Sequence, residues 1–164
     1  MIRNENMHIK IIVLGKLKES YWQAACDEYL KRLTPYAKIE IIELKEEPFR
    51  EKDTRAETQK KEAERVLPYI AEGKKKGVVI GLHEGGKEHT SVQLAKFLEE
   101  KTGGGAHVMF VIGGPLGFHP NILKQFDTQL SLSSLTFPHQ LARVILIEQL
   151  YRAVTIINGK QYHY

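Results

Sequence analysis

The chain has 164 residues, a formal net charge of +4 and a single cysteine, Cys26. This length favours one compact domain, over residues 1–164, that buries a core without disulfides or metals. One cysteine excludes an internal disulfide framework and is typical of a reducing compartment. No apolar run approaches the roughly 20 residues of a membrane span, and no secretory signal opens the sequence. We therefore expect a cytoplasmic protein that has no membrane partner.

Strand and helix patterns alternate along the chain. Short β-branched or apolar runs predict five strands, over residues 7–14, 39–44, 78–82, 107–112 and 128–132. Apolar residues at helical spacing predict the intervening helices, over residues 19–33, 54–70 with Pro68 fraying the end, 91–102, 119–126 and 138–157. Residues 1–6 are expected to form a polar extension. Such alternation predicts an α/β fold with a largely parallel sheet covered by helices on both faces.

The last third of the chain is poor in charge. Only six of the 44 Asp, Glu, Lys and Arg residues lie in 107–164, so this part is expected to supply core and an interface. The predicted helix over 138–157 is apolar nearly all round, and must therefore be covered on most sides by its own domain or by a second copy.

Ligands of parallel sheets usually bind beyond the carboxyl ends of the strands. That rule points to three loops, Leu82–Lys87, Gly113–Phe118 and Leu132–Phe137. The glycines of GGPLG permit close backbone approach to a ligand, although a tight turn explains them equally well. LSSLTF combines hydroxyls and backbone amides with apolar residues. A flat heterocycle such as adenine suits that combination, and a plain loop is the alternative.

GLHEGGKE, over residues 81–88, nearly spells a phosphate-binding loop. Glu88 stands where the motif needs a magnesium-binding hydroxyl, and its carboxylate would repel phosphate. His83, Glu84 and His89 lack the spacing that places two histidines on one metal from a helix. We expect neither a nucleotide-hydrolysing site nor a metal site here, and interpret these residues as solvated loop.

The long helix carries few polar residues. His139 and Arg143 share one edge, and Glu148 and Arg152 lie on roughly the opposite edge. An ion pair explains Glu148 with Arg152, but the two arginines could instead meet a phosphate. The chain ends in Gln161-Tyr162-His163-Tyr164, where a frayed tail is the default.

Several segments together resemble one family, the SPOUT-class ribosomal RNA large subunit methyltransferase H proteins. They are IKIIVLGKLKESYW near the start, VIGG with LG shortly after, LSSLTFPHQLARVILIEQLYRA, and the closing YH. The resemblance covers almost the whole chain from residue 7, and the third segment is long and highly specific.

This resemblance implies a SPOUT-type parallel sheet flanked by helices, with a C-terminal trefoil knot. It implies a homodimer that uses S-adenosylmethionine to methylate N3 of a pseudouridine in 23S rRNA within assembled ribosomes. The competing hypothesis is a non-catalytic RNA- or ribosome-binding module that has kept this scaffold.

The resemblance also assigns site residues. It places the methyl donor in a pocket lined by Leu82, Gly113, Leu132, Ser133, Ser134, Leu135, Thr136 and Phe137. It places His139, Arg152, Tyr162 and His163 at the RNA-facing catalytic site, with the tail completing a partner subunit's site. The tail departs from the family pattern, because Gln161 replaces a common proline and Tyr164 replaces a basic residue. Loss of that cation is expected to weaken attraction to phosphate.

Overall fold

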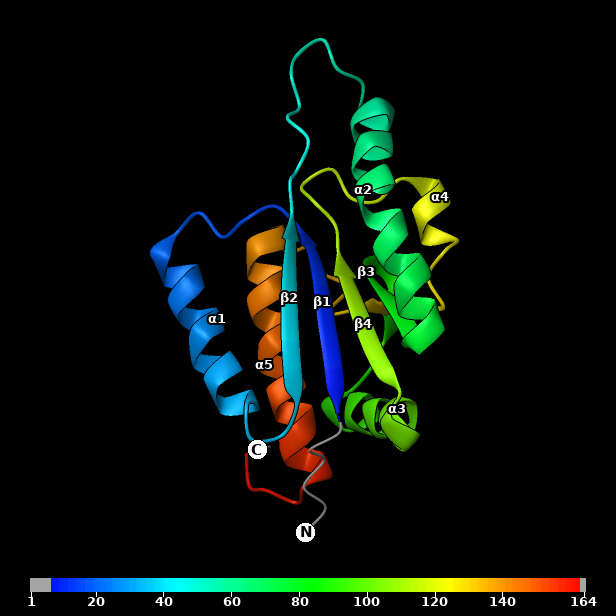
Figure 1. The fold of residues 1–164 in the computed structure, drawn as a ribbon. Helices are drawn as coiled ribbons and strands as arrows, with labels where there is room; N and C mark the ends of the chain where they lie inside the picture. Colours follow the sequence, from blue (N-terminus) through cyan, green and yellow to red (C-terminus); the bar gives the residue numbers. More distant parts are fainter. Residues whose placement is uncertain (1–6, 163–164) are drawn as a thin grey trace.

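A five-stranded parallel sheet, in the order β2-β1-β4-β3-β5, runs through the centre of the molecule (Figure 1). The computed structural model describes residues 7–162, so the expected polar extension at residues 1–6 lies outside the described residues. The strands are β1 (His8–Leu14), β2 (Lys38–Leu44), β3 (Gly77–Glu88), β4 (His107–Ile112) and β5 (Thr128–Ser131). The predicted α/β fold with a parallel sheet is confirmed.

Helices cover both faces of the sheet, as alternating apolar residues of the central strands require. On one face lie α1 (Ser20–Leu33), α3 (Ser91–Thr102) and α5 (His139–Ile157), and on the other lie α2 (Arg55–Lys76) and α4 (Pro120–Leu123). A short 3-10 turn, Gly103–Gly105, follows α3. In β1, Ile11 faces the first group of helices and Ile12 the second. Cys26 is buried in the core between the sheet and the first group of helices.

Helix α2 continues past Pro68, so the prediction that this proline frays the end of the helix is wrong. Pro68 lies on the exposed side, where the carbonyl that loses its hydrogen bond can be solvated. Packing on the inner side holds the following turns: Ile70 is buried, and Gly73 packs so closely on Met109 that an added methyl group would lie 2.7 Å from it.

Strand β3 is longer than predicted. It was expected to end at Leu82, but after a register shift between Leu82 and Lys87 it pairs with β5 again, through Lys87 with Leu130 and Glu88 with Ser131. Gly86 permits this second pairing, because a methyl group added there would lie 2.7 Å from the backbone of Gln129. The segment interpreted as a solvated loop is therefore an irregular strand.

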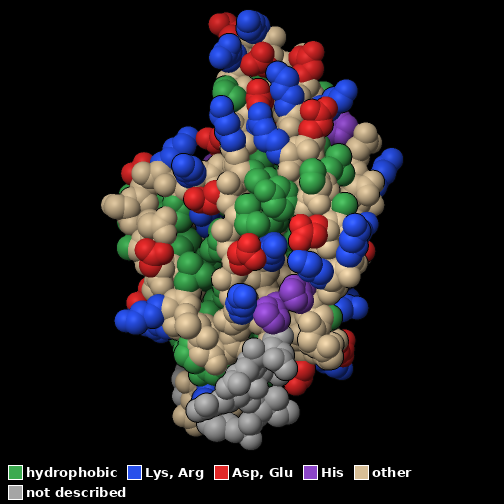
Figure 2. Space-filling view, viewed as in Figure 1, with side chains coloured by type: hydrophobic (Ala, Val, Ile, Leu, Met, Phe, Trp, Pro, Cys, Tyr) green, Lys and Arg blue, Asp and Glu red, His purple; other side chains and the backbone are tan. Residues whose placement is uncertain are grey.

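The segment 45–53 joins β2 to α2 and forms a tip at the carboxyl end of the sheet, where side chains of both charges gather (Figure 2). The Arg65 side chain fastens it to α2 by donating to the Lys45 carbonyl and to the Glu47 carboxylate. Within residues 7–162, no helix is long and apolar enough to cross a membrane. The trefoil knot stays a prediction of the resemblance.

Candidate functional site

The three predicted loop segments meet at the carboxyl edge of the sheet, because all five strands run in the same direction. They are Leu82–Lys87, Gly113–Phe118 and Leu132–Phe137. Leu82 pairs with Ile112 on one side and with Leu130 on the other, so it lies between the strand ends that lead into Gly113–Phe118 and Leu132–Phe137. The structure thus brings together the residues predicted to hold the methyl donor, namely Leu82, Gly113, Leu132, Ser133, Ser134, Leu135, Thr136 and Phe137.

Two carboxylates of β3 hold the segment Leu132–Phe137. The Ser134 hydroxyl donates to Glu88 Oε1 at 2.7 Å, and the Thr136 hydroxyl donates to Glu84 Oε2 at 2.9 Å. Between these anchors Leu135 is 71% exposed. The sequence analysis named both carboxylates but missed their contacts with these hydroxyls. The contacts depend on the irregular pairing of β3 with β5.

Helix α2 supports the segment Gly113–Phe118 from the opposite face. The Leu116 carbonyl accepts hydrogen bonds from Arg55 Nη2 at 2.8 Å and from Gln59 Nε2 at 2.7 Å. A methyl group added to Gly113 would lie 3.2 Å from the Phe118 ring. The two glycines predicted to permit close approach are therefore already closely packed on one side.

Glu62 of α2 lies against this segment and is only 3% exposed. Its Oε1 accepts from the backbone N–H of Glu47 at 3.0 Å, whereas its Oε2 has no partner among the described residues. A methyl group added to Gly114 would lie 3.2–3.3 Å from the two oxygens. Burial raises the pKa of this carboxyl above its usual value. The free oxygen is a buried acceptor at the glycine pair.

His139 opens helix α5 at the same edge of the sheet. Its Nε2 is buried and makes no hydrogen bond to any described residue. Burial lowers the pKa of the imidazole, and the nearby Glu46 carboxylate opposes that effect. Burial therefore favours the neutral form of the ring.

Arg143, one turn further along α5, is 6% exposed, and its guanidinium donates two hydrogen bonds within the chain. Its Nη1 donates to Glu43 Oε2 at 2.9 Å, and its Nη2 donates to the Gly15 carbonyl at 3.1 Å. The alternative in which Arg143 meets a phosphate is wrong, because the guanidinium binds β2 and the end of β1 instead.

A second group of predicted residues gathers at the far end of α5. Arg152 donates to Glu148 Oε1 at 2.8 Å, so the ion-pair interpretation is confirmed. The Arg152 guanidinium lies 4.8 Å from the centre of the Tyr162 ring, and the Tyr162 hydroxyl reaches Glu148 at 3.3 Å. Burial, with hydrogen bonding to Tyr29, raises the pKa of Tyr162 to about 12. His163 lies outside the described residues.

One chain does not bring the predicted catalytic residues together. His139 and Arg152 occupy opposite ends of α5, and 13 residues of helix separate them by about 20 Å. The segments predicted to bind the donor lie at the His139 end. Arg152 and Tyr162 therefore cannot serve the donor pocket of their own chain in this arrangement.

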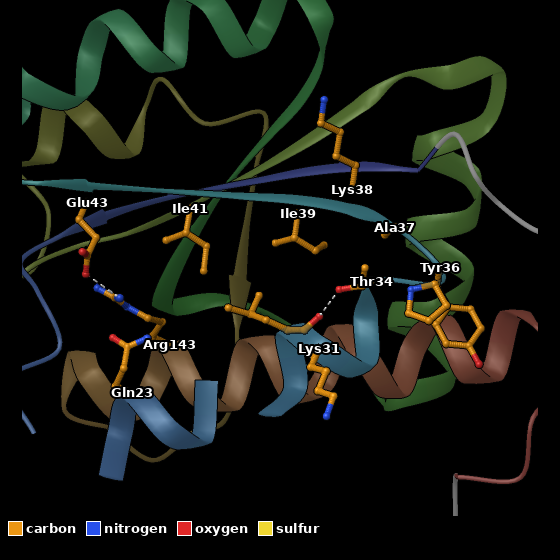
Figure 3. Close-up of a pocket in the computed structure, with 12 residues that line it drawn as sticks. Gln23, Lys31, Thr34, Tyr36, Ala37, Lys38, Ile39, Ile41, Glu43 and Arg143 are labelled. Atoms are coloured by element: carbon orange, nitrogen blue, oxygen red, sulfur yellow. Dashed lines mark hydrogen bonds and ion pairs between the residues drawn. The ribbon is translucent and has the colours of Figure 1, made fainter. Parts of the chain in front are cut away.

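A cavity of about 750 Å³ lies elsewhere, between α1 and the edge strand β2 (Figure 3). Ile39 and Ile41 line it from the strand, and the Glu43–Arg143 ion pair closes one end. It shares no residue with the predicted donor pocket, so we do not assign it to the methyl donor. Among the described residues, no group of three or more His, Cys, Asp or Glu side chains is arranged to hold a metal ion.

A parallel sheet covered by helices, with a candidate pocket at the carboxyl ends of β3, β4 and β5, places the chain in the general class of α/β proteins with a ligand site at the edge of the sheet. The family model described as "Predicted SPOUT methyltransferase" matches residues 7–163. The chain belongs to the SPOUT methyltransferase family.

Similar proteins include a putative ribosomal RNA large subunit methyltransferase H of Methanococcus maripaludis, which is 47% identical over 161 residues. Proteins named ribosomal RNA large subunit methyltransferase H from Acetivibrio thermocellus and Limosilactobacillus reuteri are 46% and 47% identical over 161 residues. Each match covers 96% of this chain and 99% of the relative. The resemblance found from the sequence is confirmed.

Proposed function

We propose that this chain transfers a methyl group from S-adenosylmethionine to N3 of a pseudouridine in 23S rRNA, on assembled ribosomes in the cytoplasm. Relatives that match nearly the whole chain are named for methylation of large-subunit ribosomal RNA. The observation that carries the proposal is the meeting of Leu82, the glycine pair and Leu132–Phe137 at one edge of the sheet.

The residues at this edge fit the proposed donor. Leu132 and Phe137 are half-buried and Leu135 is exposed, which provides apolar surface for a flat adenine ring. Glu62 Oε2, which has no hydrogen-bond partner within residues 7–162, lies at Gly114, and a buried carboxylate oxygen suits a ligand that carries positive charge. When bound, S-adenosylmethionine supplies an electrophilic methyl group.

Methyl transfer needs an in-line approach of donor and acceptor, so positioning should supply most of the rate. In our proposal Tyr162 stacks on the base, and Arg152 stabilises negative charge that develops on the carbonyl beside N3. The N3 proton must leave, and His163 is the proposed acceptor. His139 is the second imidazole of the site, at the donor end of α5.

The separation of His139 from Arg152 supports a homodimer. If two chains pair so that the far end of one α5 meets the donor segments of the other, each site contains residues of both chains. A two-fold axis would then generate two equivalent sites.

Mixing two inactive variants tests this arrangement. We expect His139→Ala and Arg152→Ala each to methylate poorly. After subunit exchange at equal amounts, half of the dimers combine both variants and contain one unaltered site, which restores about one quarter of wild-type activity. A mixture as inactive as its components would refute the shared site.

The decisive experiment incubates the full-length protein with ribosomes that lack this modification and with methyl-labelled S-adenosylmethionine, and then maps the modified nucleotide. We expect label at one pseudouridine of 23S rRNA. No label in large-subunit RNA would overturn the proposal. If calorimetry also detected no donor binding, the non-catalytic RNA- or ribosome-binding module would be the better account.

A further inference from the structure

Two buried polar atoms that lack partners among the described residues face the same glycine. They are Glu46 Oε2 and His139 Nε2. A methyl group added to Gly15 would lie 2.9 Å from Glu46 Oε2 and 3.7 Å from His139 Nε2. The two atoms are therefore separated by no more than the sum of these distances, across a space that exists because residue 15 has no side chain.

The backbone at Gly15 is shaped for this role. Its φ of +95° favours glycine. Its N–H donates to the Leu44 carbonyl at 2.8 Å, and its carbonyl accepts from Arg143. The hydrogen bonds of its N–H and its carbonyl thus hold the Gly15 backbone in place. They keep open the space between Gly15, Glu46 and His139.

Contacts with Lys18 hold the Glu46 side chain and the first turn of α5, in which His139 lies. Lys18 Nζ lies 3.2 Å from Glu46 Oε1, which leaves the other carboxylate oxygen free. The Lys18 backbone N–H donates to Gln140 Oε1 at 2.8 Å and so ties the first turn of α5 to the segment after β1. A carboxylate oxygen and an imidazole nitrogen therefore face the same space. Three separate parts of the chain form it, namely the segment after β1, the segment after β2 and the start of α5.

The charges around His139 oppose one another. Lys18 and Arg143 disfavour a proton on the ring, and Glu46 favours it. Arg143 is itself paired with Glu43. Glu46 is thus the carboxylate that can accept a hydrogen bond from the ring in either protonation state.

We propose that Glu46 is a positioning residue that orients the His139 imidazole and selects the tautomer with its proton on Nε2. The hydrogen bond passes from Nε2–H to Glu46 Oε2 through one water molecule in the space over Gly15. The other ring nitrogen, Nδ1, then carries the lone pair that can accept a hydrogen bond. This inference rests on the proposed function for the role of His139 in methylation, but the pairing itself does not.

Nuclear magnetic resonance of the full-length protein with ¹⁵N-labelled histidine tests the pairing without donor or RNA. The variants are Glu46→Gln and the matched control Glu47→Gln, because the Glu47 carboxylate is already held by Arg65 and Lys61. Loss of a signal in His139→Gln assigns the ring.

In the wild type we expect the Nε2–H tautomer. Glu46→Gln should mix the tautomers and lower the pKa of His139 by on the order of one pH unit, whereas Glu47→Gln should change neither. If Glu46→Gln leaves both the tautomer and the pKa of His139 unchanged, the pairing is refuted.

The methylation rate as a function of pH then tests whether the pairing acts in the reaction. A lower pKa keeps the imidazole neutral to lower pH, so the acid limb of the profile should move to lower pH in Glu46→Gln by the same amount. A limb that stays in place while the magnetic resonance shifts would refute a role through His139. Absence of methylation in the wild type would refute the proposed function, and the magnetic resonance result would still decide the pairing.

Discussion

Replacement of Gly81 by alanine should disturb the donor edge of the sheet from within the core. A methyl group at this position would lie 2.1 Å from the Phe126 ring, which is itself buried. The Phe126 ring packs edge-on against Phe118 with centroids 5.0 Å apart, and the Phe118 ring lies against Gly113. One added methyl group therefore acts on the donor-binding segment through two aromatic rings.

The clash fixes the expected magnitude. Contacts this short force buried side chains and backbone to move, which costs about 1–3 kcal/mol, and we expect the upper half of that range because the obstacle is a rigid ring between strand and helix. For a chain of this length, a loss of about 2–3 kcal/mol lowers the melting temperature by roughly 4–12 °C. Donor affinity should fall as well, because Phe118 must shift against Gly113.

Urea unfolding at a fixed protein concentration measures the first effect, and calorimetry with S-adenosylmethionine measures the second. The matched control is Gly103→Ala, since an added methyl group there meets nothing within 4 Å and its φ of −54° suits alanine. That variant should stay within about 0.5 kcal/mol of the wild type. Equal stability of the two variants would refute the packing of Phe126 on Gly81.

Three further predictions concern charged and titrating groups. Arg143→Met should lower the free energy of unfolding in urea by about 1–3 kcal/mol, because the Gly15 carbonyl and the Glu43 carboxylate lose a charged donor; adding Glu43→Gln should then cost little more, and strictly additive losses would contradict the pairing. Glu62→Gln should raise stability at pH 7, with the gain fading toward pH 4.5, because a carboxyl with a raised pKa stabilises the fold at low pH and loses that contribution as pH rises. A gain independent of pH in urea unfolding would contradict it. Tyr162, with a pKa of about 12, should remain protonated at pH values near 10 where an ordinary tyrosine ionises; difference absorbance against Tyr162→Phe measures this, and ionisation near 10 would place the ring in water.

Local sequence patterns predicted correctly those elements in which nearly all residues favour the same secondary structure. The buried strands β1 and β4 consist mostly of β-branched or other apolar residues, and their predicted bounds agree within one residue. The errors arose where packing overrides a local rule. Pro68 reads as a helix stop, yet α2 continues because its inner face is packed. The segment around Gly85-Gly86 was interpreted as a solvated loop, yet β3 resumes because glycine lets it pair closely with β5.

The candidate site was predictable where it follows from topology. Parallel strands bring their carboxyl ends together, so the meeting of the three loop segments at one edge could be predicted before the structure, and their role in donor binding stays a prediction. Glu46 and Glu62 could not be found in this way, because each lies in a charged stretch that suggests solvent. Their burial depends on Gly15 and Gly114, which lie far away in the sequence, and no periodicity records that contact.

Helix α5 has two unusual properties, its half-buried apolar side and the wide separation of its predicted catalytic residues, and the proposed homodimer accounts for both. The helix is buried on one side through residues such as Leu146 and Leu150, yet Leu141 and Ile145 on other sides are only half-buried. Its ends carry two groups of predicted catalytic residues that one chain holds about 20 Å apart. A second copy that covers the half-buried apolar side would remove that surface from water. Because a two-fold interface repeats every contact, the same pairing would bring the Arg152 end of each helix to the donor end of the other. In the proposed homodimer one helix would form both the interface and part of the site, and the scarcity of charge in the last third of the chain would follow from that.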